Sequence, residues 1–177
     1  MKLVLVMVTS IDGKSTHGNL PGTQDISSPG DQKHFVSIIE NARLIIMGST
    51  TYEVSKNSMQ HKKRRLRIVV TSNPSKYENE KIPEQLEFSN ESVVDLIQRL
   101  EAQGFSEGYL VGGAKTNTEF FKQGLVSEIW QTIEPKILGD GKGIVNDDDL
   151  LINLKLISTE ILNDNGTLLL KYSVERG

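Results

Sequence analysis

The chain has 177 residues, of which 37% are hydrophobic and 24% are charged, a composition typical of one globular domain with a substantial core. Its 20 basic and 23 acidic residues give a net charge of −3, which argues against the strongly basic surface that nucleic-acid binding requires. The absence of cysteine excludes disulfides, thiolate catalysis and cysteine-ligated metals.

The apolar N-terminal segment predicts a buried β-strand over residues 2–10. It is unlike a signal peptide, because it is short, carries one charge and continues into residues 9–13 without a small-residue cleavage site. No apolar run approaches the ~20 residues that a membrane-spanning helix needs. We therefore expect a cytoplasmic protein that does not enter a membrane.

Residues 11–29 are rich in Gly, Pro, Ser, Thr, Asn and Asp, and they predict a long loop. A loop of this length in a compact domain is often functional, and a simple connection is the alternative. A helix is expected to follow, with Ser28 at the N-cap and Pro29 at the first helical position, and to end near Asn41.

Strand-like and helix-like segments alternate through the rest of the chain. Strands are predicted at 43–47, 66–71, 86–88, 108–111, 125–135 and, as a hairpin, at 154–161 and 167–174; helices are predicted after Gly48, over 89–104 and from 114 to 124. Thr50 and Glu53 have capping-box spacing. Residues 61–65 predict a solvated basic loop, and 75–85 an irregular connection.

This order, strand–helix four times and then strands alone, predicts a three-layer α/β/α domain. The sheet should be mainly parallel, with antiparallel C-terminal edge strands. Ligands of such sheets bind outside the carboxyl ends of the strands. Four polar strand ends are expected to meet there, at 9–10, 48–51, 71–73 and 112–116. Their convergence favours an extended ligand that carries phosphate, such as a dinucleotide.

The double glycine Gly112-Gly113 follows an apolar run and precedes helical spacing. Glycines allow a close backbone approach to a ligand, and the following helix offers free amide groups to an anion. The Rossmann spacing is absent, and the P-loop pattern fails because Ala114 occupies the lysine position and Lys115 comes one residue late. A tight turn without a ligand is the alternative for these glycines.

Six motifs occur in the order found in a known family. They are 9–14 (TSIDGK), 28–35 (SPGDQKHF), 46–53 (IMGSTTYE), 70–72 (VTS), 111–114 (VGGA), and 124–128 (GLVSE) with 135–141 (PKILGDG). On these residues the chain resembles the dihydrofolate reductase-like reductases, and especially the riboflavin-biosynthesis reductases of the RibD C-terminal type. The resemblance covers nearly the whole chain and implies one domain over 1–177.

The resemblance implies NADPH-dependent hydride transfer to a pterin or to a ribosylamino-pyrimidine phosphate. It implies cofactor contacts at Val8, Lys14, Ser15, Gly48, Ser49, Thr50, Thr51, Thr71, Ser72, Gly112, Gly113, Ala114, Lys115, Thr116 and Asn117. The peptide between the two glycines is often cis in this family. A homodimer through the C-terminal strands is also implied.

The chain departs from the family at three points. Ser49 stands where the family commonly has an arginine that grips the 2′-phosphate, so Arg64, Arg65 or Lys76 would substitute, or the preference for NADPH over NADH would be weaker. The only tryptophan, Trp130, is not at the position beside the substrate in dihydrofolate reductases. No zinc-deaminase signature accompanies the reductase motifs.

Asp31 is the expected catalytic acid, because the resemblance places an acidic residue at the start of the first helix, facing the nicotinamide. A carboxylate that only caps this helix is the alternative. Asp12, Ser27 and Ser28 are candidate substrate contacts, although Asp12 suits a turn and Ser28 an ordinary cap. None of His17, His34 and His61 has a partner at metal-ligand spacing, and we expect all three at the surface.

Two functions of different classes follow from these patterns. The first is an NADPH-dependent reductase acting on a small molecule. The second is a non-catalytic nucleotide-binding or interaction domain built on the same fold, since a fold does not fix a function.

Overall fold

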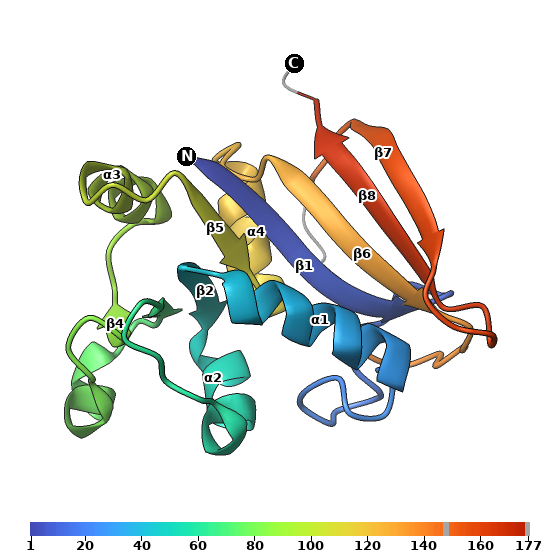
Figure 1. Ribbon diagram of the computed structural model, residues 1–177, viewed down its shortest axis with the longest axis horizontal. Helices are drawn as coiled ribbons and strands as arrows, with labels where there is room; N and C mark the ends of the chain where they lie inside the picture. The colour runs from blue at the N-terminus through green and yellow to red at the C-terminus, as the bar shows by residue number, and fades with distance from the viewer. Residues whose placement is uncertain (147–148, 176–177) are drawn as a thin grey trace.

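A computed structural model describes residues 1–146 and 149–175 and has the predicted three layers (Figure 1). The sheet contains β1 (Lys2–Ser10), β2 (Leu44–Gly48), β3 (Leu66–Val70), β4 (Leu86–Ser89), β5 (Glu107–Leu110), β6 (Glu128–Glu134), β7 (Leu154–Ile161) and β8 (Leu168–Val174). The helices are α1 (Pro29–Asn41), α2 (Ser49–Ser55), α3 (Val93–Ala102) and α4 (Ala114–Lys122), with short 3₁₀ helices at Lys56–Ser58 and Pro74–Glu80.

The strand order is β4-β3-β2-β5-β1-β6-β8-β7. The first six strands in this order pair in parallel, and β8 and β7 extend the sheet in antiparallel pairing. The predicted fold class is therefore confirmed. Because the parallel strands share a direction, their carboxyl ends meet at one edge, and this edge positions the site.

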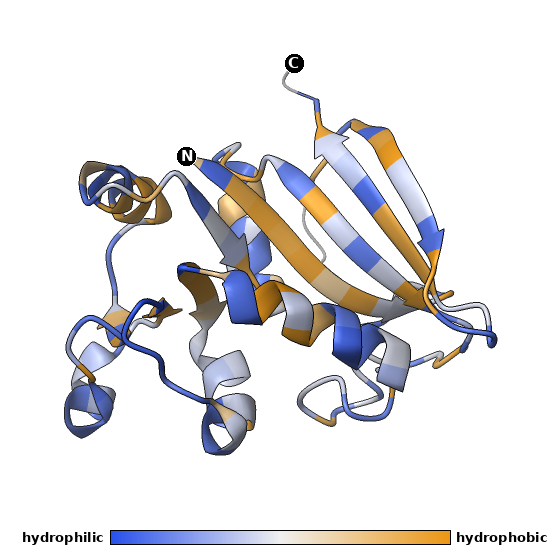
Figure 2. Cartoon of the chain, in the orientation of Figure 1, coloured by the Kyte–Doolittle hydropathy of each residue, from blue (hydrophilic) through white to orange (hydrophobic). Residues whose placement is uncertain are grey.

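The central strand β1 is apolar on both faces, as Figure 2 shows. Leu3 and Leu5 belong to one core with α3 and α4, whereas Val4 and Val6 pack on the opposite face against Ile38 of α1. A strand covered on both sides needs no polar alternation, which explains its continuous apolar sequence.

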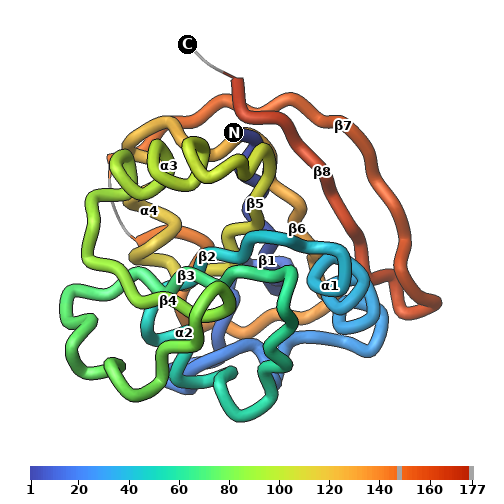
Figure 3. The backbone as a smooth tube through the Cα atoms, turned by 60° about the vertical axis from the view of Figure 1, so that its left-hand side comes forward, coloured from blue at the N-terminus to red at the C-terminus, as the bar shows by residue number. Residues whose placement is uncertain are grey.

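The β7–β8 hairpin forms the outer edge of the molecule in Figure 3. All eight residues of β7 are exposed. The hairpin turn lies at residues 162–167, where the Asn163 carboxamide oxygen accepts the backbone N–H groups of Asn165 and Thr167.

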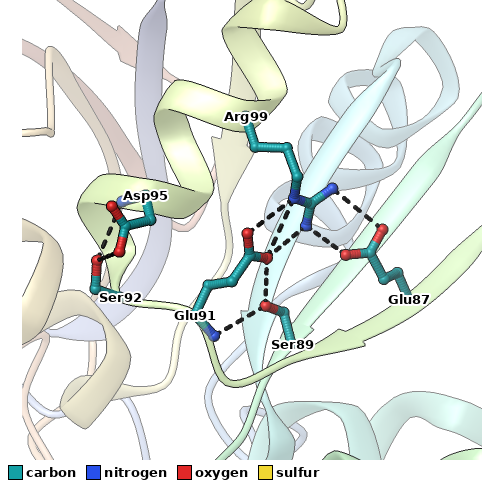
Figure 4. A network of polar contacts seen from close by, with 6 residues as sticks. All are labelled: Glu87, Ser89, Glu91, Ser92, Asp95 and Arg99. Atoms are coloured by element: carbon teal, nitrogen blue, oxygen red, sulfur yellow. Dashed lines mark hydrogen bonds and ion pairs between the residues drawn. The ribbon is translucent and has the colours of Figure 1, made fainter.

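An ion-pair network fastens α3 to β4 (Figure 4). The Arg99 guanidinium contacts the carboxylates of Glu87 and Glu91, and its Nε lies 3.0 Å from Glu91 Oε1. Ser89 in turn donates to Glu91 at 2.7 Å. The hydrogen bonds that Arg99 donates to Glu91 and Glu87 raise the pKa of Arg99. The network therefore keeps Arg99 charged and occupied.

Two local predictions are wrong. Helix α2 begins at Ser49 with Gly48 at its N-cap and no side-chain cap, so Thr50 lies inside the helix and forms no capping box; Glu53 instead pairs with Lys56 and Lys76. Residues 74–80 contain 3₁₀ turns on both sides of a kink at Tyr77 where only an irregular connection was expected, and Tyr77 packs flat against Phe88.

The core position of Leu5 gives a test of the fold. We expect Leu5→Ala to lower the free energy of unfolding by about 2–5 kcal/mol, because Leu5 is fully buried in the core shared with α3 and α4. The same substitution at Leu151, which is 91% exposed, should change it by less than ~0.5 kcal/mol. Urea denaturation measures both, and equal losses would contradict the assigned core.

Candidate active site

A cavity of about 1090 Å³ opens at the carboxyl edge of the parallel strands and extends between α1 and the sheet. It is larger than the pocket that a single small molecule requires. Fifteen of the predicted site residues line it: Val8, Ser15, Ser27, Asp31, Gly48, Ser49, Thr50, Thr51, Thr71, Ser72, Gly112, Gly113, Ala114, Lys115 and Thr116.

Four other predicted site residues lie outside the lining: Asp12, Lys14, Ser28 and Asn117. Asn117 is fully buried, and its side chain donates to the Ile144 carbonyl at 2.7 Å. Ser28 caps α1 by accepting the N–H of Asp31, so the predicted cap is confirmed. The structure brings neither of these two side chains to the cavity.

The ends of β2 and β5 meet α4 with little free space. Gly48 donates its N–H to the Gly112 carbonyl at 2.7 Å, and a Cβ on Gly48 would lie 2.4 Å from the Thr116 hydroxyl. Gly112 has φ +96°, a conformation that side chains disfavour, and its peptide bond to Gly113 is cis. Both positions therefore require glycine.

Helix α4 starts inside the cavity. Its N-cap is Gly113, and no side chain caps it, so the first amide groups have no side-chain acceptor. Ala114, Lys115 and Thr116 line the cavity at this point. Free amides, the helix dipole and a lysine together make this end of the cavity suited to an anion.

Two loops are fastened together beside the cavity. Asp12 accepts the N–H groups of Leu138 and Gly139 at 3.1 and 2.7 Å, and Ser15 donates to the Gly143 carbonyl at 2.9 Å. Hydrogen bonds from Ser10 and these two amides lower the pKa of Asp12 to about 2. The turn role of Asp12 thus extends to bracing the 11–28 loop against the 136–143 loop.

Asp31 lies in the first turn of α1 and is 7% exposed. Ser27 donates to its carboxylate, and Thr132 on β6 also bonds it. Burial raises the pKa of Asp31, and the charge of Glu134 adds to the rise, while the bonds from Ser27 and Thr132 oppose it. A buried carboxyl with a raised pKa, aimed into a cavity, can hold and deliver a proton.

Two arginines, Arg65 before β3 and Arg67 within it, also line the cavity. Arg65 and Arg67 are each 4% exposed, and Arg67 Nη1 has no hydrogen-bond partner in the described part of the chain. Arg65 Nε donates to the Ala42 carbonyl at 3.2 Å. Burial and the neighbouring Arg65 charge lower the pKa of Arg67 to about 10.

The basic run is therefore only partly the solvated loop that was predicted. Lys62, Lys63 and Arg64 are exposed, but Arg65 is buried in the cavity wall. His17 is exposed as expected, whereas His34 and His61 are partly buried, and burial lowers the pKa of both. Across residues 1–146 and 149–175 no acidic or histidine cluster could hold a metal.

Sequence reasoning missed Arg67, Thr132 and Glu134. Arg67 had a readable signal, because it interrupts an apolar strand where a charge is rarely buried without a partner. Thr132 and Glu134 lie on β6, whose alternating pattern gave no reason to single them out.

Within the described residues no helix is long and apolar enough to cross a membrane. A family model described as the RibD C-terminal domain matches residues 1–168. The chain belongs to the RibD C-terminal domain family. This family is one of oxidoreductase-like proteins of riboflavin biosynthesis, whose reductases use a nicotinamide cofactor.

Three related proteins illustrate how far the similarity extends. The chain is 26% identical to the uncharacterised protein YyaP of Bacillus subtilis over 167 residues, which covers 89% of this chain and 87% of YyaP. A putative riboflavin biosynthesis protein from Shewanella sp. PV-4 superimposes with a TM-score of 0.79, at 22% identity and with 99% and 100% coverage. Acinetobacter baumannii RibD gives 0.80 at 16% identity, over 99% of this chain and 58% of that one. The shared fold is dihydrofolate reductase-like.

The opposite pKa shifts of Asp31 and Asp12 predict opposite pH dependences of stability. The pKa of Asp31 in the folded state is raised above the ordinary 3.8. The contribution of the protonated carboxyl to stability is therefore fully present below about pH 4 and is lost as the pH rises through the folded pKa. Asp31→Asn should therefore gain stability relative to the wild type as the pH rises from about 4 to 7.

Asp12→Asn serves as the matched comparison. The pKa of Asp12 falls to about 2, so its contribution is present above the unfolded value and is lost as the pH falls through the folded value. The deficit of Asp12→Asn should thus shrink on acidification. Urea unfolding at a series of pH values measures both variants, and parallel trends would contradict the assigned environments.

Proposed function

We propose that this protein is an NADPH-dependent reductase whose substrate is a ribosylamino-pyrimidine phosphate or a close relative of it. One observation carries the proposal: a single cavity is lined by an uncapped helix N-terminus, by two buried arginines, and by a buried carboxyl with a raised pKa. These three features match a dinucleotide, an anionic substrate and a proton donor.

The residues at the carboxyl edge fit a nicotinamide dinucleotide. A side chain at Gly48 would collide with Thr116, and one at Gly112 is disfavoured by its φ of +96°, so the backbone stays open where the pyrophosphate would approach α4. Thr71 and Ser72 line the same edge and offer hydroxyls to the adenosine end. When bound, the cofactor supplies the hydride.

The 2′-phosphate would meet few free cations. Ser49 offers only a hydroxyl, Lys76 is bound to Glu53 at 2.9 Å, and Arg99 is held by its two carboxylates. Arg67 lies four residues, or about 13 Å, before Thr71 along β3, and Arg65 lies farther away still, so neither is near the adenosine end. Three lysines line the cavity, Lys62, Lys115 and Lys142, but none occupies the place of the family's arginine at position 49. We therefore propose that the preference for NADPH over NADH is weak.

Asp31 would supply the proton that accompanies the hydride. Reduction of a C=N or C=O group adds a hydride to carbon and a proton to nitrogen or oxygen, and solvent then restores the proton on Asp31. Ser27 and Thr132 fix the orientation of its carboxyl. Burial of the site excludes competing water and keeps the donor close to the acceptor.

The arginine pair favours a phosphate-bearing pyrimidine over an uncharged pterin. Two buried guanidinium groups that face a cavity, one with an unpartnered Nη1, are costly unless an anion binds them. Arginine presents a planar fork that matches phosphate oxygens. A structurally similar Thermotoga maritima protein is a diaminohydroxyphosphoribosylaminopyrimidine deaminase/5-amino-6-(5-phosphoribosylamino)uracil reductase, which supports the same substrate class.

Turnover tests the proposed function. We expect NADPH oxidation, followed at its nicotinamide absorbance, when a ribosylamino-pyrimidine phosphate is added. The kcat/KM for NADH should lie within about tenfold of that for NADPH. Asp31→Asn should reduce kcat by about 10²–10⁴-fold, because it keeps the shape of the side chain but cannot supply the proton. NADPH binding without turnover of any pterin or pyrimidine acceptor would favour the non-catalytic alternative.

The arginine pair is tested by a charge-neutral replacement. Arg67→Gln should raise the KM for the phosphate-bearing substrate about 10–100-fold and leave the affinity for NADPH unchanged, since a charged hydrogen bond contributes ~1.5–3 kcal/mol. Arg64→Gln is the matched control, because Arg64 carries the same charge but is exposed. Equal effects of the two variants, or a KM that Arg67→Gln leaves unchanged, would exclude this anion site.

A further inference from the structure

Glu134, the last residue of β6, is a buried carboxylate to which the proposed reaction gives no direct part. It is 1% exposed and lies outside the cavity lining, behind Asp31. Its Oε1 accepts the N–H of Ser28 at 2.8 Å, and its Oε2 accepts the hydroxyl of Thr167, also at 2.8 Å. Both oxygens are thus acceptors, which is the pattern of an ionised carboxylate.

These bonds join three segments that are far apart in the sequence. Ser28 begins α1, Glu134 ends β6, and Thr167 precedes β8. Asn163 completes the junction by donating to the hydroxyls of Thr167 at 2.8 Å and Ser28 at 3.2 Å. The start of α1, and with it Asp31, is therefore located by Glu134.

The hydrogen-bond partners of Glu134, Ser28 and Thr167, are neutral, and none of the ion pairs found within residues 1–146 and 149–175 involves it. An ionised group buried without a counter-charge costs stability, and an apolar side chain at this position would avoid that cost. A charge retained in such a place beside a cavity is a feature of functional sites.

We propose that Glu134 is a positioning residue that acts on the reduction through Asp31, by fixing the start of α1 and by placing a second negative charge beside the Asp31 carboxyl. The proposal rests on the proposed function only for the role given to Asp31. Its structural part, the coupling of the two carboxyl groups, stands independently of any turnover.

The other groups around Asp31 act in the opposite sense. Ser27 from the preceding loop and Thr132 from β6 donate to the carboxylate, and His34 lies one turn farther along α1; all three favour the ionised form. Lys171 of β8 and Glu160 of β7 act on His34. Glu134 is thus the charged neighbour that favours the protonated form of Asp31, together with burial.

The test is a pH titration of the Asp31 side-chain carboxyl by ¹³C NMR in the intact protein. Glu134→Gln removes the charge while preserving the size of the side chain, and we expect it to lower the Asp31 midpoint by about 0.5–1 pH unit. Glu128→Gln is the matched control, because it removes a carboxylate from the start of the same strand, where Glu128 pairs with Lys2 at 2.8 Å. It should leave the midpoint unchanged.

An unchanged Asp31 midpoint in Glu134→Gln, or an equal shift in Glu128→Gln, would overturn the proposal. If Glu134→Gln does not fold, Glu134→Asp retracts the charge by one methylene and should shift the midpoint in the same direction by less; no shift there would also overturn it. In turnover by Glu134→Gln, the alkaline limb of the pH profile of kcat/KM should move to lower pH. At pH values above this limb, kcat/KM should fall roughly 3–10-fold relative to the wild type. A protein that turns over no acceptor would refute the proposed function, while the titration would still decide the coupling.

Discussion

The parallel pairing of β1 with β5 on one side and β6 on the other is the constraint on which the rest of the molecule depends. Leu5 is in register with both Leu110 and Ile129; β5 ends at Leu110, whereas β1 and β6 continue side by side to Ser10 and Glu134. Burial of β1 on both faces holds this register. A shift by one residue would turn Leu5 towards the core that contains Val4, and Val4 towards the core that contains Leu5. Every group of the candidate site is placed by this alignment.

Charge is distributed unevenly along the cavity that results. The uncapped amides of α4 and Lys115 lie at the ends of β2 and β5, and Arg65 and Arg67 line the cavity from the β3 side. Asp31 lies on the other side of the α4 start, where Thr132 of β6 bonds it and Glu134 adds a second acidic group. A helix end that attracts anions, flanked by two arginines and by a carboxyl that can hold a proton, suits ligands that carry phosphate.

The fold was predictable from the sequence because it depends on local patterns. The apolar runs, the Ser28–Pro29 helix start and the double glycine each specify an element directly, and their order specifies the layers. The four polar strand ends could also be expected to converge, since parallel strands share a carboxyl edge.

The substrate half of the site was not predictable in this way. Arg65 sits in a run of basic residues, and only the tertiary structure shows that it turns inward while Arg64 stays exposed. Glu134 bonds Ser28, which is 106 residues away, and Thr167, which is 33 residues away. Contacts at such separations leave no periodic signal. The failed Thr50–Glu53 capping box has a local cause, because α2 begins at Ser49 and Thr50 lies inside the helix, where it cannot be the N-cap.

A crystal structure of the protein with NADP⁺ tests the central claim most directly. The account predicts that the pyrophosphate lies within hydrogen-bond distance of the first amides of α4, that the nicotinamide ring lies beside Asp31, and that the space before Arg67 stays open for a second ligand. A dinucleotide whose phosphates bind at Arg65 and Arg67, or one bound outside this cavity, would contradict it.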